Sequence, residues 1–220
     1  MSAEPTAADD TATIARQLDE HELRVLSAHA SEQTYAKNVV VVNEGDQSDT
    51  IFVILSGRVK VFLRNADGRE MVINTLGPRE YFGEMVIDEG PRSASVATLE
   101  TSRFMIITKS DFKALVAADS DFALKLVNRL MQRVRALTDN IRSLALLDVY
   151  GRVARLLLEM ATEQDGRLVV AEKLTQQDIA ERVGASREMV SRIFKDLVTG
   201  GYISLEHKRI TINRDLPEHR

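Results

Sequence analysis

The stretch DFALKLVNRLMQRVRALTDNIRSLALL, residues 121–147, decides how this chain is organised. Its apolar residues recur at steps that alternate between three and four: Val127, Leu130, Val134, Leu137, Ile141 and Leu144. This heptad spacing, with Val or Ile at one core position and Leu at the other, is typical of parallel two-stranded coiled coils. Because no Pro or Gly interrupts the stretch, we expect one helix roughly 40 Å long, at 1.5 Å per residue.

A long helix buried inside one domain would show the same periodicity. The position of the stretch favours another interpretation, because strand-rich sequence precedes it and helical sequence follows it. We therefore expect a helix that pairs two copies of the chain and joins two domains within each copy. The expected division is a first domain over residues 10–119, a dimerisation helix over 120–148 and a second domain over 149–220.

The composition is that of a soluble globular protein and excludes several kinds of site. The chain has 220 residues, enough for two small domains with cores of their own, and is 44% apolar and 28% charged. It contains no cysteine, which excludes disulfides, thiolate zinc sites and cysteine-ligated iron–sulfur clusters. No apolar run is long enough to cross a membrane. Residues 1–13 lack the features of a signal peptide and are expected to form a tail, so cytoplasm is the expected location.

The net charge of −4 is spread unevenly. Residues 1–120 carry 12 basic and 19 acidic side chains, which gives −7. Residues 121–173 carry 9 and 7, which gives +2, and residues 174–220 carry 8 and 7, which gives +1. Nucleic-acid binding depends on local rather than total charge. The C-terminal third therefore permits a nucleic-acid partner, although it is not strongly basic.

The first half is rich in short β-type runs separated by turn residues. Alternating apolar positions such as Val59, Val61 and Leu63 predict strands with one buried face. The expected strands cover residues 39–42, 51–55, 58–63, 70–76, 95–99 and 103–108. Many short strands at this spacing indicate a β-barrel or jelly roll. An amphipathic helix over residues 10–30 should precede it, and a capping box that begins at Thr108 should open a short helix after it.

The last third has the pattern of a helix-turn-helix followed by a β-hairpin. A first helix should end at residues 164–166, and two short helices should flank residues 183–186, with Thr175 and Ser186 as their N-caps. Residues 202–205 and 209–212 alternate and predict a hairpin, or wing. The fold class is therefore α+β: an N-terminal β-barrel or jelly roll, a long dimerisation helix and a C-terminal winged helix-turn-helix.

Charged residues cluster at the start of the second short helix, where they suit DNA bases. Arg187, Glu188 and Arg192 follow Ser186 and can share one exposed face near the helix N-terminus, the part that enters a major groove. Arginine can bond guanine at two atoms, and glutamate accepts from cytosine. Lys208 at the tip of the wing could contact phosphate. A helical hairpin whose charges only face solvent is the alternative.

These residues also carry a family resemblance. LTQQDIA at 174–180 and GASREMVSR at 184–192 resemble the winged helix-turn-helix of the CRP/FNR family. The resemblance implies that Arg187, Glu188 and Arg192 read bases in half-sites similar to TGTGA. It further implies DNA contacts by Thr175, Gln177, Ser186 and Lys208. Gln176 departs from the family pattern, which has an arginine near phosphate, and this implies weaker backbone contact.

A second cassette, FGEM at 82–85 with PRSAS at 91–95, offers groups that suit a cyclic nucleotide. Arg92 and Ser93 could hold a phosphate, Glu84 a ribose hydroxyl, and Gly83 would let the backbone approach. Glutamate and arginine eight residues apart are equally compatible with a surface ion pair. The cassette resembles the cyclic-nucleotide-binding domain of the same family. That resemblance implies the ligand-binding residues Gly83, Glu84, Met85, Arg92, Ser93, Ala94, Arg133, Leu137 and Thr138.

Two departures from the family pattern leave the effector open. The interval from Glu84 to Arg92 is shorter by two residues, and Leu137 stands where the family's cyclic-AMP sensors have a threonine that contacts adenine. Thr138 matches the next family position, which is contributed from the partner subunit. Cyclic AMP is the preferred effector; cyclic GMP, cyclic di-GMP and an unknown effector are alternatives.

We expect a homodimeric transcription regulator rather than an enzyme. Its expected partners are double-stranded DNA and RNA polymerase, with no membrane, no metal, no heme and no iron–sulfur cluster. A DNA-binding scaffold that has lost its effector is one alternative. A jelly-roll metalloenzyme is a remote one, because all four histidines, His21, His29, His207 and His219, lie outside the β-rich segment.

Overall fold

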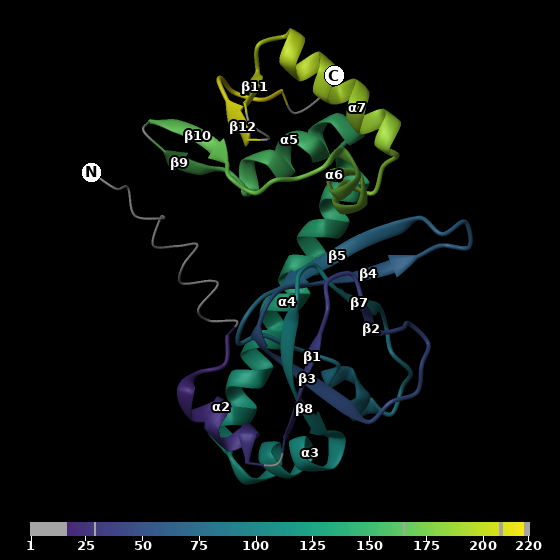
Figure 1. Ribbon diagram of the computed structural model, residues 1–220, viewed down its shortest axis with the longest axis vertical. Helices are drawn as coiled ribbons and strands as arrows, with labels where there is room; N and C mark the ends of the chain where they lie inside the picture. The colour runs from purple at the N-terminus through teal and green to yellow at the C-terminus, as the bar shows by residue number, and fades with distance from the viewer. Residues whose placement is uncertain (1–16, 29, 165, 207–208, 218–220) are drawn as a thin grey trace. The chain divides into compact units, whose positions relative to one another are not determined.

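The computed structural model describes residues 17–28, 30–164, 166–206 and 209–217 (Figure 1). The chain divides into two compact units, each described by itself below. Of the described residues, the N-terminal unit holds 17–68 and 72–136, and the C-terminal unit holds 69–71 and the chain from 137 onward. The expected long helix is confirmed as α4 (Ser120–Leu146), which contributes residues to both units. The expected tail over residues 1–13 lies outside the described residues.

Except for the first two residues of one strand, β5, the N-terminal unit contains two four-stranded sheets, with strand orders β1-β8-β3-β6 and β2-β7-β4-β5. The strands are β1 (Ser31–Tyr35), β2 (Val40–Val42), β3 (Thr50–Ser56), β4 (Val59–Arg64), β5 (Glu70–Leu76), β6 (Tyr81–Phe82), β7 (Ser95–Thr98) and β8 (Ser102–Thr108). The jelly-roll expectation is confirmed in kind, with one correction. The two sheets remain separate, so they do not close into a barrel.

Strand β3 is buried on both faces, and its alternation separates two apolar cores. Phe52 and Ile54 lie in the core between strands of the two sheets, where Phe52 stacks on Phe82 with ring centroids 4.9 Å apart. Ile51 and Val53 lie in the second core, with side chains from the helices. Because successive side chains of a strand point to opposite faces, one short strand can serve both cores.

Among the described residues, three helices supply the second core: α2 (Glu20–Ser27), α3 (Lys109–Ala118) and the first half of α4. Phe112 of α3 meets Phe122 of α4 edge to face, with ring centroids 5.8 Å apart. Thr108 caps α3 as expected, since its side chain accepts from the amide of Asp111 at 3.1 Å. These helices therefore cover one face of the β1-β8-β3-β6 sheet.

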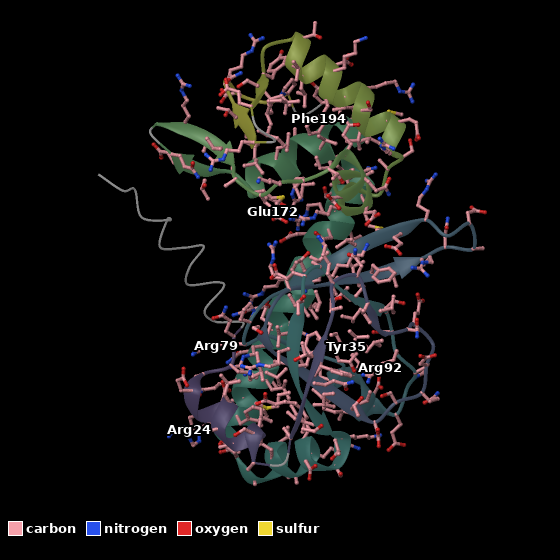
Figure 2. The ribbon with its side chains drawn as sticks, viewed as in Figure 1. Arg24, Tyr35, Arg79, Arg92, Glu172 and Phe194 are labelled. Atoms are coloured by element: carbon pink, nitrogen blue, oxygen red, sulfur yellow. The ribbon has the colours of Figure 1, made fainter. Side chains whose placement is uncertain are left out.

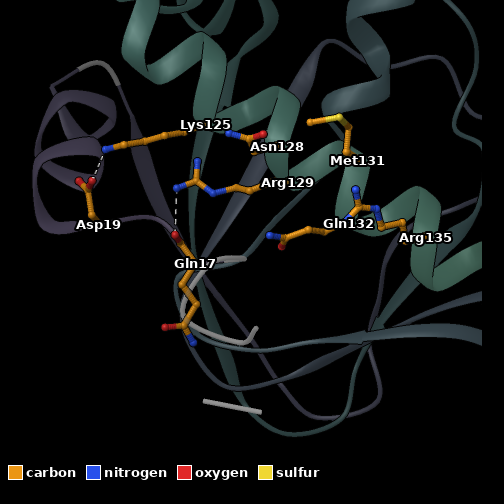
Figure 3. Close-up of a pocket in the computed structure, with 8 residues that line it drawn as sticks. All are labelled: Gln17, Asp19, Lys125, Asn128, Arg129, Met131, Gln132 and Arg135. Carbon is orange, nitrogen blue, oxygen red and sulfur yellow. Dashed lines mark hydrogen bonds and ion pairs between the residues drawn. The ribbon is translucent and has the colours of Figure 1, made fainter. Parts of the chain in front are cut away.

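Charged contacts attach α2 and the residues before it to α4, and Figure 3 shows those made by Gln17 and Asp19. Arg129 donates to both carboxylate oxygens of Glu22, at 3.0 and 2.7 Å, and to the carbonyl of Gln17 at 2.9 Å. Lys125 donates to Asp19 at 2.6 Å. Glu22 and Arg129 are buried, with 3% and 5% exposure. A cavity of about 440 Å³ lies beside these contacts, and Figure 3 shows the side chains that line it.

The C-terminal unit packs three helices against a four-stranded sheet of order β11-β12-β10-β9. Its elements are α5 (Val149–Glu159), β9 (Thr162–Gln164), β10 (Arg167–Val170), α6 (Gln176–Val183), α7 (Arg187–Thr199), β11 (Ile203–Glu206) and β12 (Arg209–Ile212). Val153, Leu157, Ile179, Val190 and Leu197 are almost completely buried in its core. The expected winged helix-turn-helix is confirmed.

Several element boundaries differ from the expectation. In the described chain the first helix begins only at Glu20, because Asp19 and Glu22 form a capping box there. Helix α5 ends at Glu159 rather than at residues 164–166, and the strands β9 and β10 follow instead. Strands β1 and β6 were not expected. Both depend on partners remote in sequence: β1 pairs with β8, and β6 pairs with β3.

Candidate functional site

The expected ligand-binding segment follows β6 in the N-terminal unit. Gly83 turns the chain in the left-handed region at φ 87°, and the 3₁₀ helix η1 (Glu84–Asp88) follows. A Cβ at position 83 would lie 2.4 Å from Nη1 of Arg92. Only glycine therefore allows this backbone conformation together with this close approach. The turn brings Gly83, Glu84 and Arg92 together.

Glu84 is a buried carboxylate, 9% exposed, that faces a guanidinium from α4. Nη1 of Arg133 donates to Glu84 Oε1 at 2.7 Å, and its Nη2 donates to the carbonyl of Tyr81 at 2.5 Å. The same guanidinium lies over the Tyr81 ring, 4.7 Å from its centroid. Burial raises the pKa of the Tyr81 hydroxyl to about 12. Two predicted residues, Glu84 and Arg133, thus contact each other.

Arg92, labelled in Figure 2, is 6% exposed and has most of its donors occupied. Nη1 donates to the carbonyl of Gly83 at 3.0 Å. Nη2 donates to Ser48 Oγ and to the carbonyl of Thr50, both at 2.7 Å, and lies 3.2 Å from Thr50 Oγ1. Burial lowers the pKa of the guanidinium, against the attraction of Glu84. Nε is buried and has no acceptor among the described residues.

The remaining predicted ligand contacts divide into two sets. Ser93 is exposed, and its hydroxyl lies 3.1 Å from the sulfur of Met85. Ala94, the next residue, is buried. Leu137 and Thr138 are exposed on α4, in the part of the helix that belongs to the C-terminal unit. Their contact with a ligand therefore stays a prediction.

Sequence reasoning missed the side chains that hold Arg92 in place. Ser48 and Thr50 lie 44 and 42 residues before it and reach it only through the fold. The one available signal was their position at the start of an apolar strand, which places hydroxyls at the end of a buried sheet. Tyr81 was likewise missed as the residue on which Arg133 stacks.

The second predicted site is the helix-turn-helix of the C-terminal unit. Thr175 and Ser186 are N-caps, and their side chains accept from the amides of Asp178 at 3.1 Å and Met189 at 3.2 Å. Gly184 ends α6 in the left-handed region at φ 66° and ψ 45°. The caps and the glycine thus fix where α7 begins, as the sequence indicated.

The predicted base-reading side chains are exposed on α7. Arg187, Glu188 and Arg192 all face solvent in the C-terminal unit. The pKa of Glu188 is lowered by hydrogen bonds to its carboxylate from the backbone amide of Glu188 and from the hydroxyl of Ser186. Glu188 is therefore a charged acceptor at neutral pH. Gln177 is exposed on α6 and donates to Glu181 at 2.9 Å. Lys208 lies outside the described residues.

Among the described residues, no three or more histidine, cysteine, aspartate or glutamate side chains are placed to hold a metal ion. In the same part of the chain, no helix has the length and apolar character required to cross a membrane.

Two family models match the chain. The cyclic nucleotide-binding domain matches residues 32–119, and the Crp-like helix-turn-helix domain matches residues 151–215. The first match contains Glu84 and Arg92, and the second contains α6 and α7. The two family models therefore cover the two expected sites, the ligand site first and the DNA-binding site second, in the order expected from the sequence.

Two curated relatives match most of the chain. The CRP-like cAMP-activated global transcriptional regulator of Mycobacterium tuberculosis is 35% identical over 184 residues, which cover 81% of this chain and 82% of that protein. The cAMP-activated global transcriptional regulator Vfr of Pseudomonas aeruginosa is 33% identical over 198 residues, which cover 85% and 91%. Both are regulators of transcription rather than enzymes.

Solved structures agree. The c-di-GMP responsive global regulator CLP of Xanthomonas campestris aligns with a TM-score of 0.78 and 25% identity, covering 88% of this chain and 99% of that one. FixK2 of Bradyrhizobium japonicum aligns with a TM-score of 0.69 at 22% identity, covering 84% and 93%, which supports the fold alone. Both domain models and the relatives thus confirm the resemblance: the chain belongs to the CRP/FNR family of transcription regulators, with a cyclic nucleotide-binding domain and a DNA-binding helix-turn-helix.

Proposed function

We propose that a cyclic nucleotide bound in the N-terminal unit gates this regulator, with cyclic AMP as the preferred effector. The proposal rests on one arrangement: a buried carboxylate, Glu84, and a buried guanidinium, Arg92, lie beside the turn at Gly83. Nε of Arg92 is buried without an acceptor in the described chain. A phosphate oxygen is the acceptor that such a donor prefers. Glu84 offers an acceptor for a ribose hydroxyl.

The rest of the pocket would complete phosphate binding and exclude water. The exposed hydroxyl of Ser93 would donate to a phosphate oxygen, and the small side chain of Ala94 would leave room for the cyclic phosphate. Met85 is 51% exposed beside Ser93 and would pack against the sugar.

Arg133 would connect ligand binding to α4. It bonds Glu84, the residue proposed to receive the ribose hydroxyl. A hydroxyl that donates to Oε1 of Glu84, the oxygen bonded by Arg133, would compete with Arg133 and change how α4 is held against η1. A ligand shifts a conformational equilibrium only by its difference in affinity for the two states. The exchange at Glu84 provides such a difference within the N-terminal unit.

The identity of the effector is part of the proposal. The curated relatives are named as cAMP-activated, which favours cyclic AMP. The structural neighbour CLP is named as c-di-GMP responsive, which makes cyclic di-GMP the second candidate. Leu137 offers no hydrogen bond to a purine, so selectivity among purines by this residue would have to come from packing. Cyclic GMP as the effector, and a regulator that needs no effector, are the remaining alternatives.

We further propose that the regulator is a homodimer joined along α4. The predicted seam residues are exposed in the single chain, including Val134 at 62% and Ile141 at 66%. A continuous exposed apolar stripe with heptad spacing indicates a helical partner, and a second copy supplies an identical stripe. The expected division of the chain into a first domain over residues 10–119, a dimerisation helix over 120–148 and a second domain over 149–220 is part of this proposal.

The homodimer would read palindromic half-sites similar to TGTGA through Arg187, Glu188 and Arg192. Two-fold symmetry would place the two recognition helices one turn of DNA apart, about 34 Å. Thr175, Gln177, Ser186 and Lys208 would contact the DNA beside them. Such a regulator would act in the cytoplasm and meet RNA polymerase there.

Calorimetric titration with cyclic AMP, cyclic GMP and cyclic di-GMP tests the effector. We expect saturable binding of cyclic AMP by the wild type and none by Arg92→Leu. Arg103→Leu is the matched control, because Arg103 is an exposed arginine of the same unit that pairs with Glu32 at 3.7 Å. Unchanged binding by Arg92→Leu would remove the phosphate assignment. Saturable binding of cyclic di-GMP alone would replace the effector.

Fluorescence anisotropy with duplexes tests DNA reading. Arg187→Ala should cost about 1–3 kcal/mol on a palindromic TGTGA duplex and relax selectivity at one base position. Lys195→Ala, which removes an exposed charge from the same helix, should weaken all sequences alike or leave them unchanged. Equal loss on every sequence for Arg187→Ala would contradict base reading. Addition of the effector should raise wild-type affinity for the palindrome.

A further inference from the structure

The guanidinium of Arg92 is bound by the segment that leads into β3. Ser48 Oγ and the carbonyl of Thr50 both lie 2.7 Å from Nη2, and Thr50 Oγ1 lies 3.2 Å from it. The backbone of the same segment also holds residue 92: Arg92 donates its amide to Asp46, and Gly45 donates to the Arg92 carbonyl, each at 2.9 Å. The arginine is therefore fixed at both ends of its side chain.

The donors and acceptors around Nη2 do not match in number. Nη2 has two hydrogens, and three oxygen acceptors lie within 3.2 Å of it. Nη1 donates one of its two hydrogens to Gly83, and the buried Nε has no acceptor among the described residues. A phosphate that forms a bidentate pair through Nε and Nη2, which lie on one edge of the guanidinium, must therefore displace an acceptor already present at Nη2. The two hydroxyls are the acceptors that can leave, because the Thr50 carbonyl is part of β3.

Ser48 is the hydroxyl best able to give way. Its oxygen lies 3.0 Å from Thr50 Oγ1 as well as 2.7 Å from Arg92. When Arg92 turns toward another acceptor, Ser48 keeps a hydrogen bond to Thr50. Neither hydroxyl is then left buried without a partner, so the exchange avoids the cost of an unpaired polar group.

We propose that Ser48 sets the affinity of the nucleotide site, because its hydroxyl retains Arg92 and competes with the cyclic phosphate for it. The proposal rests on the function proposed above and identifies a residue that regulates that site. It fixes the sign of an effect. If Ser48 competes with phosphate, removal of its hydroxyl tightens nucleotide binding. If Ser48 instead aims Arg92 at the phosphate, the same change weakens binding.

The test is the dissociation constant of cyclic AMP, measured by calorimetry on the full chain. We expect Ser48→Ala to bind about tenfold more tightly than the wild type, a change of about 1.4 kcal/mol. Ser48→Thr, which keeps the hydroxyl, should bind as the wild type does. Ser102→Ala is the matched control, since Ser102 is a buried serine of the same unit that donates to Glu100 at 2.8 Å and not to Arg92.

A second background shows whether the effect passes through the guanidinium. In Arg92→Lys chains, the additional change Ser48→Ala should alter the dissociation constant less than in the wild type, because an ammonium cannot form the bidentate pair from which Ser48 is displaced. An equal tightening in both backgrounds would overturn the proposal. Thr50→Val removes the second hydroxyl and should act in the same direction, which keeps the sign testable if Ser48→Ala does not fold.

The outcomes separate the two proposals. A wild type that binds none of the cyclic nucleotides would overturn the effector proposal and this one together. A wild type that binds, with Ser48→Ala unchanged or weaker, would overturn only the role of Ser48. Thermal unfolding of each variant identifies changes in folding that would mimic a change in affinity.

Discussion

Asp19 carries the titration most clearly linked to a single contact. The hydrogen bond from Lys125 is the largest of the effects that lower its pKa from 3.8 to about 2. A carboxylate whose pKa is lower in the folded chain stabilises that chain above about pH 4, and the contribution is lost as the pH falls through about 2. Both side chains are 47% exposed, so the contribution stays below about 1 kcal/mol.

Substitution of Lys125 by Met should raise the pKa of Asp19 toward its ordinary value. Titration of the Asp19 carboxyl carbon by nuclear magnetic resonance measures this directly. In the wild type, acid unfolding should begin at a slightly higher pH than the lowered pKa of Asp19 alone would give. The reason is that other carboxylates become protonated as well. An unchanged Asp19 titration in Lys125→Met would assign the low pKa to the backbone amide of Glu22 instead.

At the scale of single residues, the sequence indicated which chemical groups a site needs better than it indicated which residues contact one another in the fold. Glu84 and Arg92 were singled out because a cyclic phosphate and a ribose would require such groups near a glycine, and the structure places both beside Gly83; their contact with a ligand stays a prediction. The heptad spacing leaves Arg129 outside the seam and gives no sign that it is buried against Glu22, 107 residues away. Contacts of such separation depend on the folded topology, which local periodicity does not encode.

The attachment of α2 to α4 makes a prediction about stability. Glu22→Gln should destabilise the N-terminal unit by about 3–5 kcal/mol, because it leaves the charge of Arg129 buried without its partner. Urea unfolding measures the loss. Glu20→Gln, on the same helix but exposed, should change stability by less than about 1 kcal/mol. A double change, Glu22→Leu with Arg129→Met, should be milder than Glu22→Gln alone, and a greater loss would refute the account.

The N-cap of α7 leads to a second prediction about the stability contributed by a single element. Ser186→Ala removes the acceptor for the Met189 amide and should cost about 1 kcal/mol in the free energy of unfolding. Ser191→Ala is the matched control, because Ser191 is exposed within the same helix, where alanine is the better helix former. Equal effects from the two substitutions would argue against the cap.

The elements that the sequence predicted well are those whose signals are local. Heptad spacing predicted α4 to within one residue at each end, and caps with Gly184 predicted α6 and α7. The hairpin of β9 and β10 was missed because its strands have only three and four residues and β9 is wholly exposed. A strand that short gives no alternation to detect, and only its pairing partner defines it.

At the scale of the whole molecule, α4 determines what one copy of the chain leaves unsatisfied. The heptad residues of α4 do not enter the core of either unit, and six of them are 36% to 66% exposed. Exposed apolar surface of this extent is costly in water. Burial against a second α4 would remove that cost.

Ile141 provides the sharpest test of this assembly, because it lies on the seam, is 66% exposed and is not among the predicted ligand contacts. Ile141→Asp would place two like charges inside the paired helices, where each is desolvated. Analytical ultracentrifugation should show a dimer for the wild type and, for Ile141→Asp, a dissociation constant raised at least about a hundredfold, or about 2.8 kcal/mol. Leu146→Asp makes the same change at a residue that is 70% exposed on α4 but off the seam, and should leave the dimer intact. Equal weakening by both changes would indicate a general effect of charge on the helix, and a monomeric wild type at micromolar concentration would refute pairing along α4.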